Sequence, residues 1–292
     1  MPAIGVIGGS GFYDMPGLED IRDETVTTPF GDPSDFIRIG RLDGVEVAFL
    51  PRHGRGHRIM PTAVNARANF WALKSLGVRW VISVSAVGSM REHIEPLHVV
   101  VPDQLIDRTR QRPMTFFDTP GLVVHVGMGE PFSARLSGLL AEAAEIEGAH
   151  VHRGGTYVCI EGPQFSTRAE SETFRSWGVD VIGMTALPEA RLAREAEICY
   201  ALLAMVTDYD VWHEGEEDVS AEMVIANLMA NTSLSQRVVR RAVGQIPTDG
   251  SACECADALA TAIITAPDAI PPELAERHDL LVGRYLNRPE TD

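Results

Sequence analysis

Residues 63–84 read AVNARANFWALKSLGVRWVISV, and this stretch decides the fold class. Its first part, Ala63 to Leu76, has the length and apolar spacing of an amphipathic helix. Its last part, Trp80 to Val84, is a short apolar run typical of a buried strand. A second such run, Val45 to Leu50, precedes the helix. A strand, a helix and another strand in succession favour an α/β fold whose sheet is covered on both faces.

The same alternation continues along the chain. Further strands are predicted at residues 4–7, 36–39, 99–101, 157–160, 179–182 and 202–206, and further helices at residues 134–146, 168–177 and 221–230. Ser133 and Ser220 can cap two of these helices. The pair Asp43-Gly44 predicts a β-hairpin, so the sheet is expected to be mixed. No repeat or linker divides the chain. We therefore predict one domain over residues 1–292, with a mixed central sheet flanked by helices on both faces and a polar, Pro-punctuated surface tail at about 267–292.

The composition excludes several classes of protein. The chain has 292 residues, 45% of them apolar and 23% charged, as in ordinary soluble globular proteins. Its formal charge of −16 disfavours nucleic acid and anionic membranes as partners. The N-terminus lacks a basic leader, no apolar run reaches membrane-spanning length, and four cysteines are too few for a secreted disulfide framework. A cytoplasmic location is the expectation.

Small and basic residues follow the first, third and fourth apolar runs. Gly8-Gly9-Ser10-Gly11 lets a backbone approach an anion closely, although a tight turn without a ligand explains it equally well. Arg52 and His53 supply donors for a phosphate, or belong to an exposed basic loop. Ser85 and Ala86 end the strand that starts at Trp80, where a close-packed turn is the simpler interpretation. Ligands of open α/β sheets bind at the carboxyl ends of strands, so the three endings can converge on one anion.

Three later segments carry the remaining candidates. Phe165 follows a Gly-Pro loop and can stack on a purine, although a loop Phe usually serves packing. Residues 181–185 end another predicted strand. Asp208 and Asp210 stand two apart at a buried strand end, where carboxylates are costly unless they have partners. Turn capping explains one of these aspartates more easily than both.

Together these motifs resemble the S-methyl-5'-thioadenosine phosphorylase family of the trimeric purine nucleoside phosphorylase superfamily. The segments that carry the likeness are GVIGGSGFYD, TPFGDPSD, RHGRGHRIMP, SAVGSM, DQLIDRTRQRP, IEGPQFSTRAE, GMTALPEA and TDYDVWHEGEEDVS, from about Ile4 to Val224. The resemblance implies a nucleoside phosphorylase-like fold and a pentosyltransferase of purine and methionine salvage. Its reaction is reversible phosphorolysis of methylthioadenosine to adenine and 5-methylthioribose 1-phosphate. Inorganic phosphate is the co-substrate, no other cofactor or metal is expected, and the partners are copies of the chain in a homotrimer or a dimer of trimers.

The resemblance also assigns roles position by position. Phosphate would be held by Ser10, Arg52, His53, Ser85, the backbone of Ala86, and Thr185. The purine thionucleoside would be bound by His125, Phe165, Gly183, Met184, Asp208, Asp210, Val224 and Ile225, and the catalytic residues would be His53, Asp208 and Asp210. Asp208 would hydrogen-bond at N7 of the purine, and Asp210 would support it or meet the exocyclic amine. Met184 would lie under the ribose and Phe165 beside the base. His125 would reach into a neighbouring subunit near the 5' position, and Val224 and Ile225 would form an apolar wall there.

Alternatives to this reaction stay open. Relatives that act on 6-oxopurines have Asn at the position of Asp208, and a Glu where Ser166 follows the loop Phe; a carboxylate here favours a 6-amino purine. Gly183, however, stands where methylthioadenosine enzymes usually have Asn, and Ala221 replaces a larger Val near the 5' group. A 6-oxopurine or methylthioinosine phosphorylase is therefore the second candidate, a hydrolytic nucleosidase the third, and a nucleoside-binding protein without catalysis the non-enzyme alternative.

Cys253 and Cys255 form a C-x-C pair that resembles the oxidisable pair of thermophilic archaeal members. Two ordinary thiols are the simpler interpretation. A metal site is not expected, because the surrounding sequence offers no further ligands.

Overall fold

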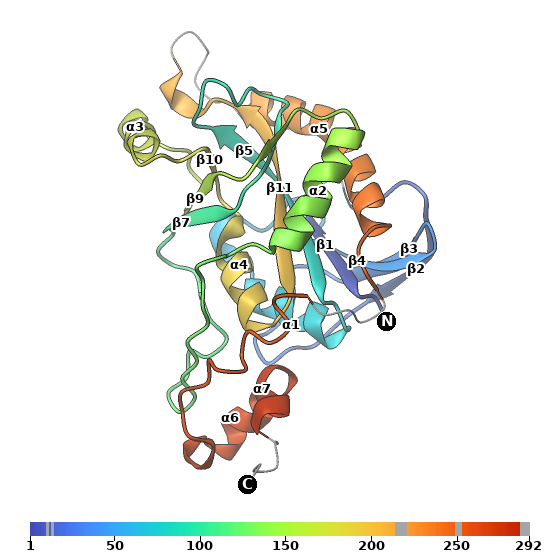
Figure 1. Cartoon of the computed structure of the whole chain (residues 1–292), viewed down its shortest axis with the longest axis vertical. Coiled ribbons are helices and arrows are strands. Elements are labelled where there is room, and N and C mark those ends of the chain that lie inside the picture. The colour runs from blue at the N-terminus through green and yellow to red at the C-terminus, as the bar shows by residue number, and fades with distance from the viewer. Residues whose placement is uncertain (10–11, 13–14, 214–220, 249–252, 287–292) are drawn as a thin grey trace.

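A long central strand, β5 (Trp80–Ser89), organises the sheet of this α/β protein (Figure 1). The structure is a computed structural model that describes residues 1–9, 12, 15–213, 221–248 and 253–286, leaving out the side chains of residues 221–226 and 228–230. β5 runs parallel to β1 (Ile4–Gly8) on one side and to β11 (Cys199–Asp208) on the other. The sheet is mixed, as the hairpin motif predicted, because β3 (Ile37–Leu42) and β4 (Val45–Pro51) pair antiparallel across Asp43-Gly44.

The remaining elements follow the order of the chain. The other strands are β2 (Leu18–Glu24), β6 (Val99–Val101), β7 (Gln104–Arg108), β8 (Val151–Arg153), β9 (Thr156–Ile160) and β10 (Val181–Gly183). The α-helices are α1 (Ala66–Ser75), α2 (Ala134–Ile146), α3 (Arg168–Ser176), α4 (Ala186–Glu195), α5 (Ala221–Val243), α6 (Pro272–Arg277) and α7 (Asp279–Leu286). Short 3-10 helices are η2 (Pro61–Ala63), η3 (Asp210–Trp212) and η4 (Pro267–Ala269).

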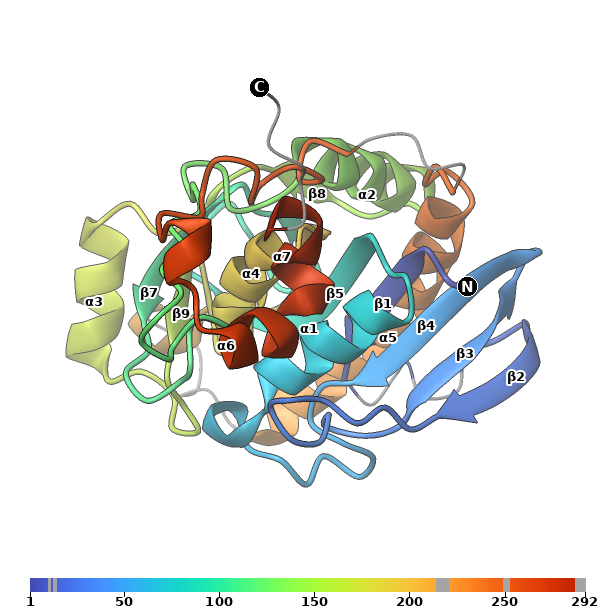
Figure 2. The ribbon, with the colours of Figure 1, turned by 90° about the horizontal axis from the view of Figure 1, so that it is seen from below.

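Period-two alternation along the strands builds two hydrophobic cores, one on each face of the sheet. On β11, Tyr200 and Leu202 belong to one core, whereas Leu203 and Met205 belong to the other. Helices α1, α4, α6 and α7 cover the first face, as Figure 2 shows. Helices α2 and α5 cover the second (Figure 1). The predicted class, an α/β fold with helices on both faces, is therefore confirmed.

Several elements differ from the sequence-based prediction. The sequence pattern missed the strands β2, β7 and β8 and the helices α4, α6 and α7. β2 is a mostly charged, exposed run, and α4 contains Pro188 near its start. The segment from Pro267 lies at one end of the molecule in Figure 1 but is not simply a surface tail. Leu274, Leu281 and Val282 are buried against the first core, because α6 and α7 turn their apolar side chains inward.

The sheet branches at the carboxyl end of β5, and this branch positions the candidate site. Residues up to Ser83 pair with β1, whereas Gly88 and Ser89 pair antiparallel with β10. The pairing of β11 with β5 shifts register between Val206 and Asp208, which leaves Thr207 as a bulge. Bulges often turn a side chain toward an active site. Here the bulge directs the last residue of a buried strand into the space between the branches.

Candidate functional site

A cavity of about 930 Å³ lies at this branch. Its walls come from the ends of β5, β10 and β11, the loop after β4, the loop before α3, and part of α5. The lining residues include Gly9, Arg52, His53, His57, Ser85, Ala86, Gly88, Phe165, Ser166, Ile182, Gly183, Met184, Thr185, Asp208, Asp210, Asn231, Thr232 and Ser235. A mostly apolar cavity of this size with a few converging polar groups suits a small-molecule ligand.

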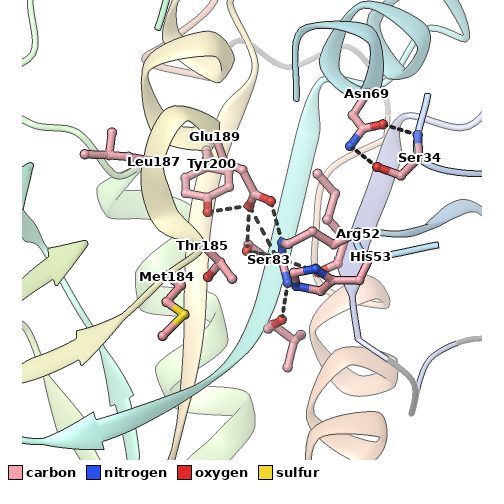
Figure 3. Close-up of polar contacts among 12 residues, drawn as sticks. Ser34, Arg52, His53, Asn69, Ser83, Met184, Thr185, Leu187, Glu189 and Tyr200 are labelled. Carbon is pink, nitrogen blue, oxygen red and sulfur yellow. Dashed lines mark hydrogen bonds and ion pairs between the residues drawn. The ribbon is translucent and has the colours of Figure 1, made fainter. Parts of the chain in front are cut away.

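Arg52 forms the cationic wall of the cavity, and Glu189 holds its guanidinium in place (Figure 3). The Glu189 carboxylate accepts from Arg52 Nε at 2.5 Å and from Nη2 at 3.3 Å, and it also accepts from Ser83 Oγ and Tyr200 Oη. Arg52 Nη1 donates to the carbonyl of Val84. Burial opposes the charge on Arg52, but the carboxylate outweighs it and keeps the pKa above its usual value. The arrangement fixes a charged guanidinium at the wall of the cavity.

His53 stands beside Arg52 as a neutral imidazole. Its Nδ1 lies 2.8 Å from the carbonyl oxygen of Ile59. A carbonyl only accepts, so Nδ1 carries the proton and Nε2 keeps its lone pair. Burial, followed by the charge of Arg52, lowers the pKa of His53 to about 4. The ring therefore offers a proton acceptor next to a fixed cation.

Thr185 and Ser85 place two hydroxyls on the same cavity. Tyr157 is fully buried, and its hydroxyl accepts from the backbone N–H of Thr185 at 3.2 Å and lies 3.4 Å from Thr185 Oγ1. A Cβ on Gly183 would lie 2.1 Å from that same hydroxyl. Ser85 Oγ is buried and has no hydrogen-bond partner among the described residues. These hydroxyls remain available to a ligand.

Arg112 fixes the apolar wall by joining two loops. Its Nη1 donates to the carbonyls of Met184 and Leu187, and its Nη2 donates to the carbonyl of Glu161. Its Nε also pairs with the Glu161 carboxylate. Arg112 therefore holds the segment after β10 in place, and Met184 of that segment lines the cavity. Phe165, 46% exposed, stands at the rim on the other loop.

Asp208 and Asp210 form a buried pair at the end of β11. Asp208 Oδ1 accepts from the backbone N–H of Asp210 at 2.9 Å, and its Oδ2 accepts from Thr207 Oγ1 at 2.7 Å. Both bonds fix the orientation of the Asp208 carboxyl group. Asp210 has a φ of 53°, a left-handed conformation that is uncommon outside glycine. Such strain persists where the surrounding structure enforces it, often at functional sites.

Asp210 is a member of this pair with a raised pKa. Burial, together with repulsion from Asp208, raises the pKa of Asp210 to about 6, although a hydrogen bond from Ser171 opposes the shift. Asp210 Oδ2 is buried and meets no hydrogen-bond geometry with the described residues, and Ser166 stands beside Asp210 and, like Ser171, opposes the rise of its pKa. Unpaired polar atoms in a buried cavity are costly unless a ligand satisfies them.

The cavity brings together most of the residues that the sequence singled out. These are Arg52, His53, Ser85, Ala86, Phe165, Gly183, Met184, Thr185, Asp208 and Asp210. Ser10 and the side chains of Val224 and Ile225 lie outside the described part of the chain. His125 is absent from the cavity wall; it is exposed, and its backbone N–H donates to the carbonyl of Ala262.

Sequence reasoning missed Glu189, Tyr157 and Arg112, which hold these residues in place. Each acts across the fold on a residue far along the chain, so no local pattern marks it. An Arg or Glu in a polar stretch normally indicates a solvated face. The Pro before Glu189 and the strand pattern around Tyr157 signalled only secondary structure.

Comparisons with known proteins agree over most of the chain. The family model of the phosphorylase superfamily matches residues 3–244. S-methyl-5'-thioadenosine phosphorylases of Geobacter sulfurreducens and Chloroflexus aurantiacus are 57% and 59% identical; the alignments cover 97% of this chain in both cases, and 99% and 98% of those proteins.

Solved structures give the same result. A methylthioadenosine phosphorylase from an Antarctic soil metagenomic library superposes with a TM-score of 0.91 at 48% identity, over 96% of this chain and 98% of its own. A methylthioadenosine phosphorylase from Schistosoma mansoni in complex with adenine gives 0.79 at 38% identity, over 84% and 92%.

Proposed function

Since this chain belongs to the phosphorylase superfamily and, within it, to the S-methyl-5'-thioadenosine phosphorylase family, we propose that it catalyses the reversible phosphorolysis of methylthioadenosine. The products are adenine and 5-methylthioribose 1-phosphate. It is a pentosyltransferase of the purine nucleoside phosphorylase type, and phosphate is its co-substrate. Copies of the chain in a homotrimer or a dimer of trimers are the proposed partners, and a cytoplasmic location stays a sequence-based prediction.

One observation carries the proposal. A single cavity holds both a cationic wall, built by Arg52, and a buried carboxylate pair, Asp208 and Asp210. A hydrolase would need no fixed site for an anion. A purine leaving group, in contrast, needs a proton donor at N7 while the sugar is attacked.

Arg52 and His53 prepare the nucleophile in this proposal. Arg52 Nη1 carries two N–H groups, and one of them donates to the carbonyl of Val84, its one described acceptor. The other is proposed to donate to phosphate. The hydroxyls of Ser85 and Thr185 add donors, as would Ser10 and the backbone of Ala86. The neutral ring of His53 accepts a hydrogen bond from a phosphate hydroxyl through Nε2, which orients the phosphate for attack.

Attack at C1' proceeds through a sugar with cationic character. The phosphate beside C1' stabilises that charge electrostatically, and Met184 provides an apolar floor under the ribose. The bond from C1' to the purine nitrogen breaks as the bond from C1' to phosphate oxygen forms. The electrons of the broken bond move onto the purine.

The aspartate pair receives the leaving base. A proton held by the pair passes to N7, which neutralises the charge that develops there. Asp208 is proposed to stand at N7 and Asp210 to meet the 6-amino group, whose N–H donates to a carboxylate oxygen. A 6-keto oxygen would face a carboxylate instead and be repelled, so adenine is preferred over hypoxanthine. Ser166 Oγ supplies a further polar contact, and Phe165 packs beside the base.

The 5' end is the part of the site that depends on the assembly. Val224 and Ile225 on α5 are proposed to contact the methylthio group. His125, exposed and outside this chain's cavity, is proposed to reach the 5' region of a neighbouring subunit. Full activity then requires an oligomer.

Product analysis tests the proposal. Methylthioadenosine, methylthioinosine, adenosine and inosine are each incubated with the enzyme, with and without phosphate. The expected result is phosphate-dependent release of adenine and a sugar phosphate, fastest with methylthioadenosine. Free sugar released at equal rate without phosphate would indicate a nucleosidase. Faster release of hypoxanthine would indicate the 6-oxopurine alternative, and no turnover a binding protein.

A further inference from the structure

Three cysteines meet at the end of β11 farthest from the cavity. Cys199 begins that strand, and Cys253 and Cys255 lie on the segment that follows α5. Their three Sγ atoms all lie within 4.8 Å of one another. Cys199 and Cys255 are buried, and Cys253 is partly exposed. No local pattern predicts a third thiol beside the C-x-C pair, because only the fold brings Cys199 there.

A carboxylate and a guanidinium complete the surroundings of the thiols. Glu254 Oε2 lies 3.9 Å from Cys199 Sγ. Its other oxygen, Oε1, accepts from Ser133 Oγ at 2.5 Å and from the backbone N–H of Arg135 at 3.4 Å, at the N-terminus of α2. Arg194 Nη1 lies 3.8 Å from Cys255 Sγ. One carboxylate oxygen is thus held in place while the other faces Cys199 Sγ.

The three sulfur atoms lie close enough together to form one compact group of soft donors. Thiolate, not thiol, is the form that binds metals.

We propose that Cys199, Cys253 and Cys255 bind one Zn²⁺ ion, with Glu254 Oε2 as the fourth donor. Three sulfurs and one oxygen are a donor set that tetrahedral zinc accepts. A Zn–S distance of about 2.3 Å in a tetrahedron requires sulfurs about 3.8 Å apart, so the cluster needs a contraction of about 1 Å at most. On binding, the protons that remain on the thiols are released to solvent. Arg194 partly offsets the negative charge of the four-donor complex and can donate an N–H to the coordinated sulfur of Cys255.

The role of this site is structural. Cys199 and Asp208 stand at opposite ends of β11, about 30 Å apart at about 3.3 Å per residue. The ion would fasten the segment after residue 253 to the start of β11. Glu197, just before that strand, already binds the same segment by accepting from the backbone N–H of Leu259 at 3.0 Å and from Arg284 Nη2 at 2.6 Å. The proposal is independent of the proposed function.

Metal content and cobalt spectroscopy of the full-length protein test it. Protein purified under reducing conditions is analysed for zinc by mass spectrometry, then stripped with a chelator and titrated with Co²⁺. We expect about one Zn²⁺ per chain and a thiolate-to-cobalt charge-transfer band that Zn²⁺ abolishes. Stripping is expected to lower the melting temperature of the wild type, and Zn²⁺ to restore it.

Variants locate the ion. Cys199→Ser and Cys253→Ser are expected to weaken binding at least tenfold, and Glu254→Gln to change the cobalt d–d bands. Cys159→Ser, which alters a buried thiol on β9, is the matched control and should keep its metal. Equal zinc in the wild type and in Cys253→Ser would overturn the proposal. The proposal would also be overturned if the reduced wild-type protein bound neither Zn²⁺ nor Co²⁺ at micromolar metal. A protein in which two of the three cysteines only form a disulfide on oxidation would give that result. The wild-type titration decides this even if a variant does not fold.

Discussion

The hydroxyl of Tyr157 fills the space that a side chain at position 183 would occupy. A Cβ on Gly183 would lie 2.1 Å from that oxygen, a distance that no real pair of atoms tolerates. Tyr157 uses the space to bind the backbone N–H of Thr185. The glycine that departs from the family pattern is therefore matched in packing to the tyrosine of the neighbouring strand.

Tyr157→Phe tests that relationship. Losing one neutral hydrogen bond of about 1 kcal/mol should raise the KM for phosphate roughly fivefold, because Thr185 loses the group that orients it. Steady-state kinetics with each substrate varied in turn measure the effect. The KM for methylthioadenosine is the internal control and should change little; an equal rise in both KM values would contradict a role confined to Thr185.

Gly88→Ala should impair catalysis with a small effect on stability. A Cβ there would lie 2.9 Å from Asp208 Oδ1 and 3.0 Å from Ile182, so the carboxylate has to move. We expect kcat to fall at least tenfold with a thermal midpoint within a few degrees of the wild type. Gly138→Ala, in α2 with nothing within 4 Å, is the control and should keep full activity. Unchanged kcat in Gly88→Ala would mean that the position of Asp208 is not critical.

Asp208→Asn should lower turnover of methylthioadenosine by about 10²–10⁴-fold, the usual effect of losing a catalytic acid. An amide can donate to a 6-keto oxygen but cannot transfer a proton, so the ratio of inosine to adenosine turnover should rise. Rate measurements on matched 6-amino and 6-oxo nucleosides check both statements. If the variant melts lower by about 1 kcal/mol but keeps its rate and its preference, Asp208 serves only the turn.

Asp210→Asn should stabilise the ligand-free protein above neutral pH. The folded state raises the pKa of Asp210 from 3.8 to about 6. Ionisation of Asp210 therefore destabilises the folded state by its full amount above pH 6, and has no effect below the pKa of 3.8 in the unfolded chain. At 1.36 kcal/mol per unit this amounts to about 3 kcal/mol as an upper value. Asn also tolerates the left-handed backbone. Denaturant titrations at pH 8 and pH 3.5 should differ in this gain, and an equal effect at both would contradict it.

How much of this fold and site the sequence predicts depends on how far apart along the chain the interacting residues lie. Local alternation located the β11 segment, the α2 helix from Ala134 to Ile146, and the hairpin at Asp43-Gly44. Motifs likewise supplied Arg52 and Asp208. The partners that fix these groups, such as Glu189 for Arg52, come from elements that only packing brings together. Helix α4 itself was missed because Pro188, near its start, is more typical of a loop than of a helix interior.

None of the described helices has the length and apolar character needed to cross a bilayer.

The pairing of Arg52 with Glu189 also has a consequence for biosynthesis. During translation, the first third of the chain leaves the ribosome with a guanidinium destined for the interior, while its carboxylate partner has yet to be made. A buried cation without its partner costs several kcal/mol. The amino-terminal half therefore has no stable native state of its own, and nascent chains become competent only after α4 has been synthesised and has docked. A split of the gene between residues 52 and 189 should yield fragments that fold only when they associate.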